Sequence, residues 1–382
     1  MQPARSSSYA RSGRASALPL AVLLSATVAI AAACGSTGET GAIAAGTEGA
    51  GGLVNGGGGA LPTHTTTHHP TTTTEVGAGG TGGTGGAEPA LGPPYPVVFA
   101  HGFFGFDQFA GLDFETYFFE LKDHLAAEGE VVFTPTVDPF NSSDVRGEQL
   151  LEHVLSVIAE TGHAKVNLVG HSQGGLDARV VAHLRPDLVA SVVTVGTPHH
   201  GSPVSDVVLK VVSDPNAQGV IDELVKLIGA PIWDQVGSST SVTKSLAQFS
   251  TAGIALFNQK YTDAPGVLYA SIAGRSKLSK GGDDCKPTVT QQFVAKYGGT
   301  LDPLNPFFAI AQPILAGGLT QYPNDGLVRA KDARWGEFWG CIPADHLDEI
   351  GQILGQDPGF GNDWRHKPFY SSLVKYLRVR GL

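Results

Sequence analysis

The fold class of this chain is decided by ten residues, Val166-Asn-Leu-Val-Gly-His-Ser-Gln-Gly-Gly175. The first four are an apolar run typical of a buried strand. The next five fit the pattern G-x-S-x-G, and a helical pattern follows over residues 176–184. A strand, a tight turn that carries a serine and then a helix form the setting in which that serine becomes a nucleophile. We therefore predict that Ser172 is a nucleophile; the competing interpretation is a glycine-rich turn without chemistry.

The oxyanion that such a serine creates needs hydrogen-bond donors. The helix that begins just after Ser172 offers backbone N–H groups, and Gln173 is the first of them. A second donor is expected in the loop after the apolar run 97–100, where we assign the backbone N–H of Phe103. The neighbouring His101 is expected to make structural hydrogen bonds rather than to act as a base.

Strand and helix signals alternate on both sides of this motif. A chain of alternating strands and helices favours a mostly parallel sheet that is covered by helices on both faces, an α/β fold. The expected strands are residues 97–100, 131–133, 166–169, 189–195 and 266–273, and the expected helices are 145–160 and 176–184.

A serine nucleophile also needs a base and an acid that orients the base. In folds with this motif the chain order is serine, acid, histidine. His346 lies late in the chain after a proline-containing loop and is the predicted base, with His366 as the alternative. Asp325, 21 residues earlier, is the predicted acid, although an aspartate in a turn also serves as a turn former. The competing acids are Asp302, Asp332, Asp345 and Asp348.

The N-terminus has the features of an export signal. Residues 1–33 combine a basic start with an apolar stretch that ends in alanines, too short for a stable membrane span. The next residue, Cys34, resembles the acylated cysteine of a bacterial lipobox; ordinary cleavage after an Ala-x-Ala site is the alternative. We expect the protein to be exported and either secreted or anchored as a lipoprotein at the outer membrane or cell surface.

Composition separates the rest of the chain into two parts. Residues 34–92 are rich in glycine and threonine and cannot bury enough apolar surface to fold, so they are predicted to be a disordered tether. Residues 93–382 suit one large domain. The net charge of −10 repels phosphate backbones and argues against a nucleic-acid partner.

The chain has three cysteines. If Cys34 carries lipid, Cys285 and Cys341 remain, and an exported protein would readily pair them. The alternative is two free buried thiols.

Taken together, these motifs resemble the bacterial true lipases of the Pseudomonas and Burkholderia type, which have the α/β-hydrolase fold. The matching segments occur in order over roughly residues 94–380. They are Tyr95–Gly102, Arg146–Leu151, Lys165–Leu176, Val192–Pro198, Asn324–Val328 and His346–Ile350. The resemblance implies Ser172, Asp325 and His346 as the catalytic triad, in agreement with the residues alone.

The resemblance also implies one structural calcium ion. Its ligands would be the carboxylates of Asp302 and Asp348 and the backbone carbonyls of Gln352 and Gln356, a set of oxygens that suits Ca²⁺. The ion would hold the loop that carries His346; two solvated loop carboxylates are the alternative. The family's disulfide would match Cys285 and Cys341.

The resemblance further implies a helical cap over residues 203–262. The helix expected at residues 220–228 carries an apolar stripe. It would form a lid whose apolar face contacts lipid when the lid opens; the alternative is an ordinary helix that packs on the core. Many members of the family need a membrane-bound foldase. The expected activity is hydrolysis of triacylglycerols; the alternatives are a short-chain carboxylesterase, a polyester depolymerase, or a lipid-binding surface lipoprotein without catalysis.

Overall fold

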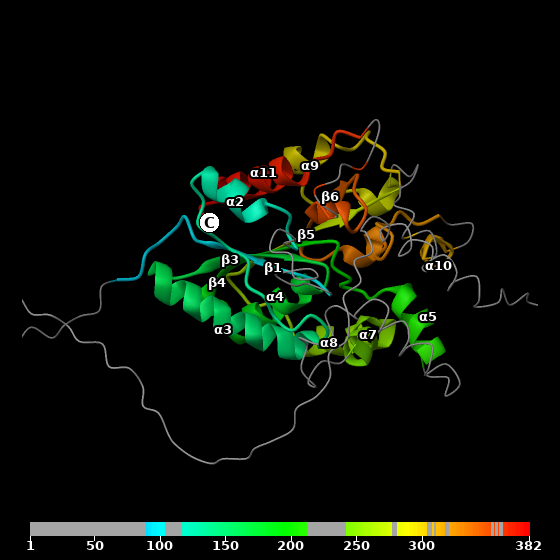
Figure 1. The fold of residues 1–382 in the computed structure, drawn as a ribbon, viewed down its shortest axis with the longest axis horizontal. Helices are drawn as coiled ribbons and strands as arrows, with labels where there is room; N and C mark the ends of the chain where they lie inside the picture. Colours follow the sequence, from blue (N-terminus) through cyan, green and yellow to red (C-terminus); the bar gives the residue numbers. More distant parts are fainter. Residues whose placement is uncertain are drawn as a thin grey trace, which may run out of the picture. The chain divides into compact units, whose positions relative to one another are not determined.

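Six described strands form one sheet at the centre of the domain, and every pair of neighbouring strands is parallel. Their order across the sheet is β2-β1-β3-β4-β5-β6. Figure 1 shows the sheet between two layers of helices. The strands are β1 (Val97–Ala100), β2 (Val132–Phe133), β3 (Val166–His171), β4 (Val189–Val195), β5 (Leu268–Gly274) and β6 (Glu337–Ile342).

The structure is a computed structural model, and it describes part of the chain. The described residues are 89–103, 117–212, 242–276, 281–303, 308, 311–317, 321–352, 355, 358 and 362–382. The predicted export signal, Cys34, almost all of the predicted tether, the stripe at 220–228 and Gln356 lie outside these residues. Glu88–Leu382 forms one compact unit.

Helices cover both faces of the sheet (Figure 1). The helices α2 and α11 pack on one face through a large apolar cluster, and α3 and α4 pack on the other through a second cluster. The helices are α2 (Leu121–Ala127), α3 (Ser143–Thr161), α4 (Gln173–Leu184), α5 (Pro203–Val212), α7 (Val242–Phe249), α8 (Thr251–Lys260), α9 (Gln292–Ala295), α10 (Gln312–Ala316) and α11 (His366–Val379). Short 3₁₀ turns are η1 (Pro186–Leu188), η2 (Gly282–Cys285), η5 (Ala330–Ala333) and η6 (Asp348–Ile350).

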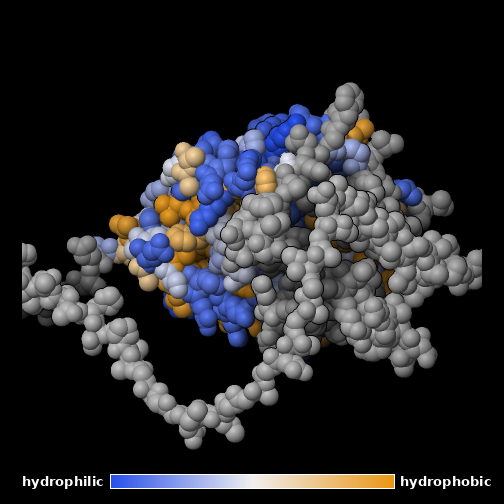
Figure 2. All heavy atoms as spheres, viewed as in Figure 1, coloured by the Kyte–Doolittle hydropathy of each residue, from blue (hydrophilic) through white to orange (hydrophobic). Residues whose placement is uncertain are grey.

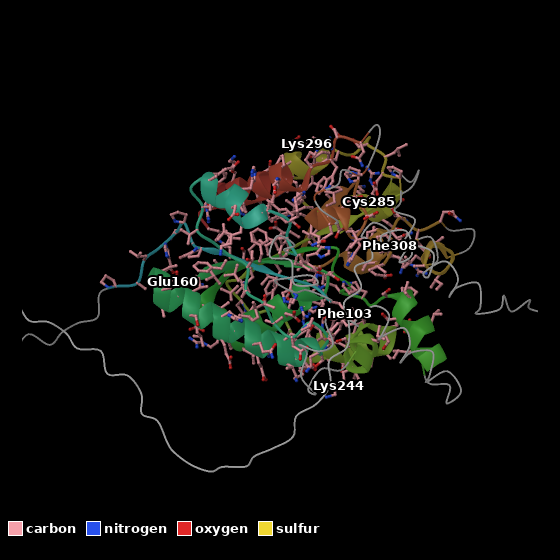
Figure 3. The ribbon with its side chains drawn as sticks, viewed as in Figure 1. Phe103, Glu160, Lys244, Cys285, Lys296 and Phe308 are labelled. Carbon is pink, nitrogen blue, oxygen red and sulfur yellow. A yellow bond between two sulfur atoms is a disulfide. The ribbon has the colours of Figure 1, made fainter. Side chains whose placement is uncertain are left out.

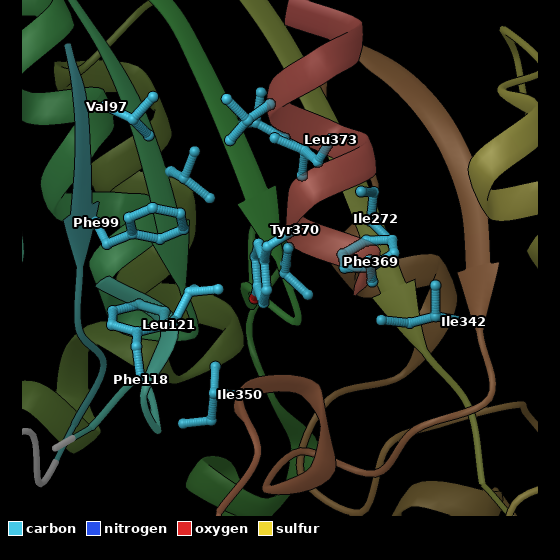
Figure 4. Close-up of a cluster of buried hydrophobic side chains, with 14 of the residues drawn as sticks. Val97, Phe99, Phe118, Leu121, Ile272, Ile342, Ile350, Phe369, Tyr370 and Leu373 are labelled. Carbon is cyan, nitrogen blue, oxygen red and sulfur yellow. The ribbon is translucent and has the colours of Figure 1, made fainter. Parts of the chain in front are cut away.

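The packing on the two faces of the sheet explains why the sequences of the strands are continuous apolar runs. Figure 4 shows Val97 and Phe99 of β1 facing Tyr370 and Leu373 of α11. The alternate residues of the same strand face α3 and α4, because successive side chains of a strand point to opposite faces. A strand buried on both faces is apolar throughout, so β1, β3 and β4 could be predicted from sequence.

The predicted elements are confirmed, with one strand missed. The expected strand 189–195 matches β4 residue for residue, and the expected helix 145–160 lies within α3. The strand β6 was not predicted, since Gly340 interrupts its apolar pattern, although all but its first residue are buried.

All strands of a parallel sheet point the same way, so the loops at their carboxyl ends share one edge. The loop after β1, the turn after β3, the segment between β5 and β6, and the loop after β6 all leave from this edge. These are the segments that carry Phe103, Ser172, Asp325 and His346. Ligand and catalytic sites of open α/β sheets lie at this edge.

A disulfide joins Cys285 to Cys341 and confirms the predicted pairing. It ties η2 to β6; Cys285 is labelled in Figure 3. Since Cys341 is close to the end of β6, the disulfide holds the strand from which the loop to His346 departs.

The surface carries isolated apolar residues. Leu256 of α8 and Val379 of α11 are the most exposed large apolar side chains of the described residues, at 67% and 84%. Figure 2 shows hydrophobic atoms scattered among hydrophilic ones on the coloured part of the surface. Such single residues are normal on the surface of folded domains. No helix within the described ranges has the length and apolarity that crossing a membrane requires.

Candidate active site

Ser172 occupies a tight turn between β3 and α4. Its backbone has φ 54° and ψ −128°, a region that is strained for a residue with a side chain. The flanking glycines make the turn possible: a Cβ atom at Gly174 would lie 2.0 Å from the Ala100 carbonyl oxygen, and one at Gly170 would lie 2.4 Å from the Gly175 nitrogen. Ser172 remains partly exposed although His171 and Gln173 are buried. This is the strained strand-turn-helix geometry that lifts a serine above a sheet.

The loop after β1 lies directly against this serine. A Cβ atom at Gly102 would be 2.6 Å from the Cβ of Ser172, so the Gly102–Phe103 backbone passes beside the hydroxyl. The Phe103 ring packs edge-on against Phe140 and Phe249 (Figure 3 labels Phe103). Gln173 begins α4, where the first N–H groups of a helix lack intrahelical partners. Phe103 follows Gly102 and Gln173 follows Ser172, so both predicted oxyanion donors adjoin the contact between Gly102 and Ser172.

Buried side chains hold this loop in place. The Arg146 guanidinium donates to the carbonyl oxygens of His101 and Gly102 at 2.6 and 3.3 Å, and to the carboxylate of Asp177 at 2.8 Å. The ring of His101 accepts from the Val137 N–H at 3.0 Å. Burial, with the charge of Arg146, lowers the pKa of His101 to about 3. A neutral, hydrogen-bonded His101 has the structural role that we expected.

Asp325 and His346 form a buried pair. The Asp325 Oδ2 lies 2.9 Å from Nδ1 of His346, and the His346 N–H donates to the Asp325 carbonyl at 2.8 Å. The other carboxylate oxygen of Asp325 accepts from the backbone N–H groups of Leu327 and Val328. Asp325 thus both forms a turn and pairs with His346.

The structure brings His346 to the nucleophile turn. Its ring lies against the ring of His171, with centroids 4.6 Å apart, and His171 immediately precedes Ser172. Among the described hydrogen bonds, none joins the Ser172 hydroxyl to His346. Catalytic hydrogen bonds are often long in a free enzyme and tighten when substrate binds.

The alternative base His366 and two other histidines after Ser172 form hydrogen bonds elsewhere. The ring of His366 hydrogen-bonds the Phe119 carbonyl at 2.9 Å, and that of His183 hydrogen-bonds the Thr262 carbonyl at 3.0 Å. His199 is buried between Thr194 and Arg179. Among these histidines, only His346 pairs with a carboxylate next to the nucleophile turn.

Three residues near Ser172 and the Asp325–His346 pair were missed from sequence. Tyr117 Oη lies 2.7 Å from Nδ1 of His171, whose Nε2 lies 2.8 Å from Oε2 of Glu349. Burial lowers the pKa of His171 and raises that of Glu349, where the charges of Asp325, Asp345 and Asp348 add to the shift. The spacing of Glu349, three residues after His346 in a motif already singled out, was the one available signal.

The predicted calcium ligands Asp302 and Asp348 are close together, and Asp345 joins them. One carboxylate oxygen from each lies within 4.8 Å of the others. Asp302 is fully buried, and its Oδ2 has no hydrogen-bond partner within the described part of the chain. Burial and the charges of Asp345 and Asp348 raise the pKa of Asp302 to about 8. An orphaned carboxylate oxygen beside two further carboxylates fits a hard divalent cation.

The predicted cap region is partly described. The helices α5, α7 and α8 fall within it, and the buried residues Phe249, Ile254 and Phe257 of α7 and α8 pack against Leu176 and Val180 of α4. Phe103 packs against the same cluster. A buried apolar cluster therefore lies next to the loop after β1.

Comparison with known proteins points to one enzyme family. The chain is 35% identical over 288 residues to a triacylglycerol lipase of Pseudarthrobacter phenanthrenivorans, covering 68% of this chain and 90% of that protein. It is 38% identical over 280 residues to a triacylglycerol lipase of Vibrio cholerae, covering 70% and 83%. The family model for the alpha/beta hydrolase fold matches residues 95–219. The fold resembles the Staphylococcus hyicus lipase, with TM-score 0.54, 17% identity and coverage of 78% and 99%.

Proposed function

Because this chain belongs to the bacterial triacylglycerol lipases of the α/β-hydrolase fold and is an ester hydrolase, we propose that it cleaves triacylglycerols with Ser172, His346 and Asp325. The observation that carries the proposal is the strained Ser172 turn beside the buried Asp325–His346 pair. The triacylglycerol substrate is inferred from the lipases to which the chain is similar.

The chemistry runs in two steps. His346 removes the proton of the Ser172 hydroxyl as the oxygen attacks the ester carbonyl, and it then protonates the departing alcohol. Water attacks the resulting acyl-enzyme with His346 again as base, which releases the fatty acid and restores the serine. The backbone N–H groups of Phe103 and Gln173 bind the oxyanion of each tetrahedral intermediate.

Asp325 acts through His346. Its Oδ2 bonds Nδ1 and therefore keeps the unprotonated Nε2 toward the serine. Two backbone N–H groups hold the other oxygen, which keeps the carboxylate oriented. Replacing such an aspartate with asparagine lowers kcat by about 10⁴ in serine proteases, because the tautomer is wrong.

Labelling and kinetics test the triad. A fluorophosphonate probe is expected to label the wild-type chain readily. It is expected to label Asp325→Asn only slowly and to leave Ser172→Ala unlabelled. Rates on p-nitrophenyl esters of increasing acyl length test the substrate class. Activity on the butyrate ester alone would indicate a short-chain esterase instead of a lipase. A wild-type chain that the probe does not label would indicate a lipid-binding lipoprotein without catalysis.

A calcium ion at Asp302 and Asp348, with the Gln352 and Gln356 carbonyls, completes the proposal. When bound, the ion supplies positive charge that holds these oxygens together and does not touch the substrate. Asp348 is two residues from His346, so the ion would restrain the loop of the base. Calorimetric titration with Ca²⁺ is expected to show binding that Asp302→Asn removes and that the exposed control Asp283→Asn retains.

The cell location and partners belong to the same proposal. Cleavage before Cys34 and its acylation would anchor the enzyme, with residues 35–92 as the tether. In the native host, Cys34→Ser is expected to release activity into the medium; unchanged location would favour plain secretion. A membrane-bound foldase is a further candidate partner, and refolding of the denatured domain alone would argue against it.

A further inference from the structure

A buried hydrogen-bond network runs beneath the nucleophile turn. Both ring nitrogens of His171 take part: Nδ1 is 2.7 Å from the Tyr117 hydroxyl and Nε2 is 2.8 Å from Oε2 of Glu349. The Gly102 backbone N–H donates to the Tyr117 hydroxyl oxygen. These distances fit an arrangement in which Tyr117 donates to Nδ1 and the Nε2–H donates to Glu349.

This network touches two parts of the proposed machinery. At one end, Gly102 belongs to the oxyanion loop and lies against Ser172. At the other, the rings of His171 and His346 are in tilted contact, and Oε2 of Glu349 is 3.9 Å from Nδ1 of His346. Tyr117, His171 and Glu349 therefore connect the oxyanion loop to the base behind the serine.

The surrounding backbone leaves the network no room to shift. A Cβ atom at Gly196 would lie 2.2 Å from Oε2 of Glu349, and one at Gly274 would lie 2.1 Å from Oε1. At Gly102 a Cβ atom would lie 2.5 Å from the Tyr117 hydroxyl. Glycine is needed at all three positions for these polar side chains to fit.

We propose that Tyr117, His171 and Glu349 are positioning residues that fix the His346 ring relative to the oxyanion loop. The bond to Asp325 fixes one atom of His346 but leaves the ring free to tilt about it. The ring of His171, itself held at both nitrogens, blocks that tilt on one face. Catalytic groups must be held within about 0.5 Å, and a misplacement of about 1 Å costs up to a hundredfold in rate. This inference rests on the proposed function of His346.

The test compares two tyrosines, of which one hydroxyl holds His171 and the other does not. Tyr117→Phe removes the hydroxyl that holds His171. Tyr370→Phe is the matched control, because it removes another buried hydroxyl near Glu349 and Tyr117. The Tyr370 hydroxyl has no hydrogen-bond partner among the described residues. On p-nitrophenyl butyrate we expect Tyr117→Phe to lower kcat by roughly tenfold with KM within about twofold, and Tyr370→Phe to change neither. Fluorophosphonate titration counts the active sites, so that kcat refers to folded enzyme.

A second variant tests whether the residues act as one unit. His171→Phe keeps a ring against His346 but loses both hydrogen bonds, so adding Tyr117→Phe is expected to lower kcat no further. Equal kcat values per titrated site for Tyr117→Phe and Tyr370→Phe would overturn the proposal, as would effects that multiply in the double variant. If His171→Phe fails to fold, the tyrosine comparison decides alone. An inactive wild-type chain would instead refute the proposed function.

Discussion

Replacing Arg146 with methionine is expected to be among the most damaging changes in the domain. Arg146 and its partner Asp177 have fully buried side chains, and the guanidinium also donates to the carbonyl oxygens of Asp138, His101 and Gly102. Methionine keeps most of the volume but leaves a carboxylate buried without its counter-charge. Breaking one side of such a pair costs about 3–5 kcal/mol.

This cost can be converted into a measurable shift. A loss of about 4 kcal/mol, with an m-value of about 3 kcal/mol per molar urea, lowers the urea midpoint by about 1.3 M. We expect this shift in urea unfolding followed by tryptophan fluorescence. Because Arg146 holds the carbonyls of the oxyanion loop, ester hydrolysis per folded molecule is expected to fall as well.

Two further variants test whether the burial of the Arg146–Asp177 pair causes the loss of stability. Arg185→Met removes the arginine of the solvent-exposed Arg185–Asp187 pair, and no measurable midpoint shift is expected, because water screens exposed pairs. Adding Asp177→Leu to Arg146→Met is expected to restore part of the loss, since no unpaired buried charge remains. If Arg146→Met and Arg185→Met unfold at the same urea concentration, the argument from burial is wrong.

Three further predictions concern metal, disulfide and pH. A chelator is expected to lower the melting temperature of the wild-type domain but not that of Asp302→Asn, as calorimetry with and without Ca²⁺ would show; equal responses would count against the site. Replacing Cys285 and Cys341 by serine is expected to cost about 4 kcal/mol in guanidinium unfolding, because the disulfide spans 56 residues of chain; a cost near zero would mean the loop is already restrained. Burial lowers the pKa of His101 from 6.5 to about 3. Below about pH 6.5, His101 is therefore protonated in the unfolded chain but stays neutral in the native state. Stability is therefore present above that pH and is lost as the pH falls, by about 1.4 kcal/mol per unit for this group, and His101→Asn should show a shallower loss in urea titrations.

Much of the fold could be predicted because the strands are buried on both faces. β4 is apolar from Val189 to Val195 apart from Ser191 and Thr194, so its limits are readable from sequence alone. β6 was missed because Trp339-Gly340-Cys341 breaks the apolar run. Gly340 has φ 113°, a backbone conformation that tertiary packing selects and that no local pattern announces.

The candidate site divides in the same way. Chain order and local motifs were enough to select Ser172, Asp325 and His346, and the structure brings them to one sheet edge. The Tyr117–His171–Glu349 network was not predictable, because its members are far apart in the chain and meet only through packing. Glu349 is 178 residues from His171, yet their side chains form a hydrogen bond.

Sequence alone therefore determined which residues could do the chemistry, since a tight strand-turn-helix with two glycines is a local constraint. Tertiary structure alone decided how those residues are held. Buried polar groups must find partners wherever the chain folds back, and those partners, such as Arg146 for the oxyanion loop and Asp345 beside Asp302, come from distant segments. Local patterns record backbone geometry and apolar burial, whereas long-range hydrogen bonds leave little trace in them.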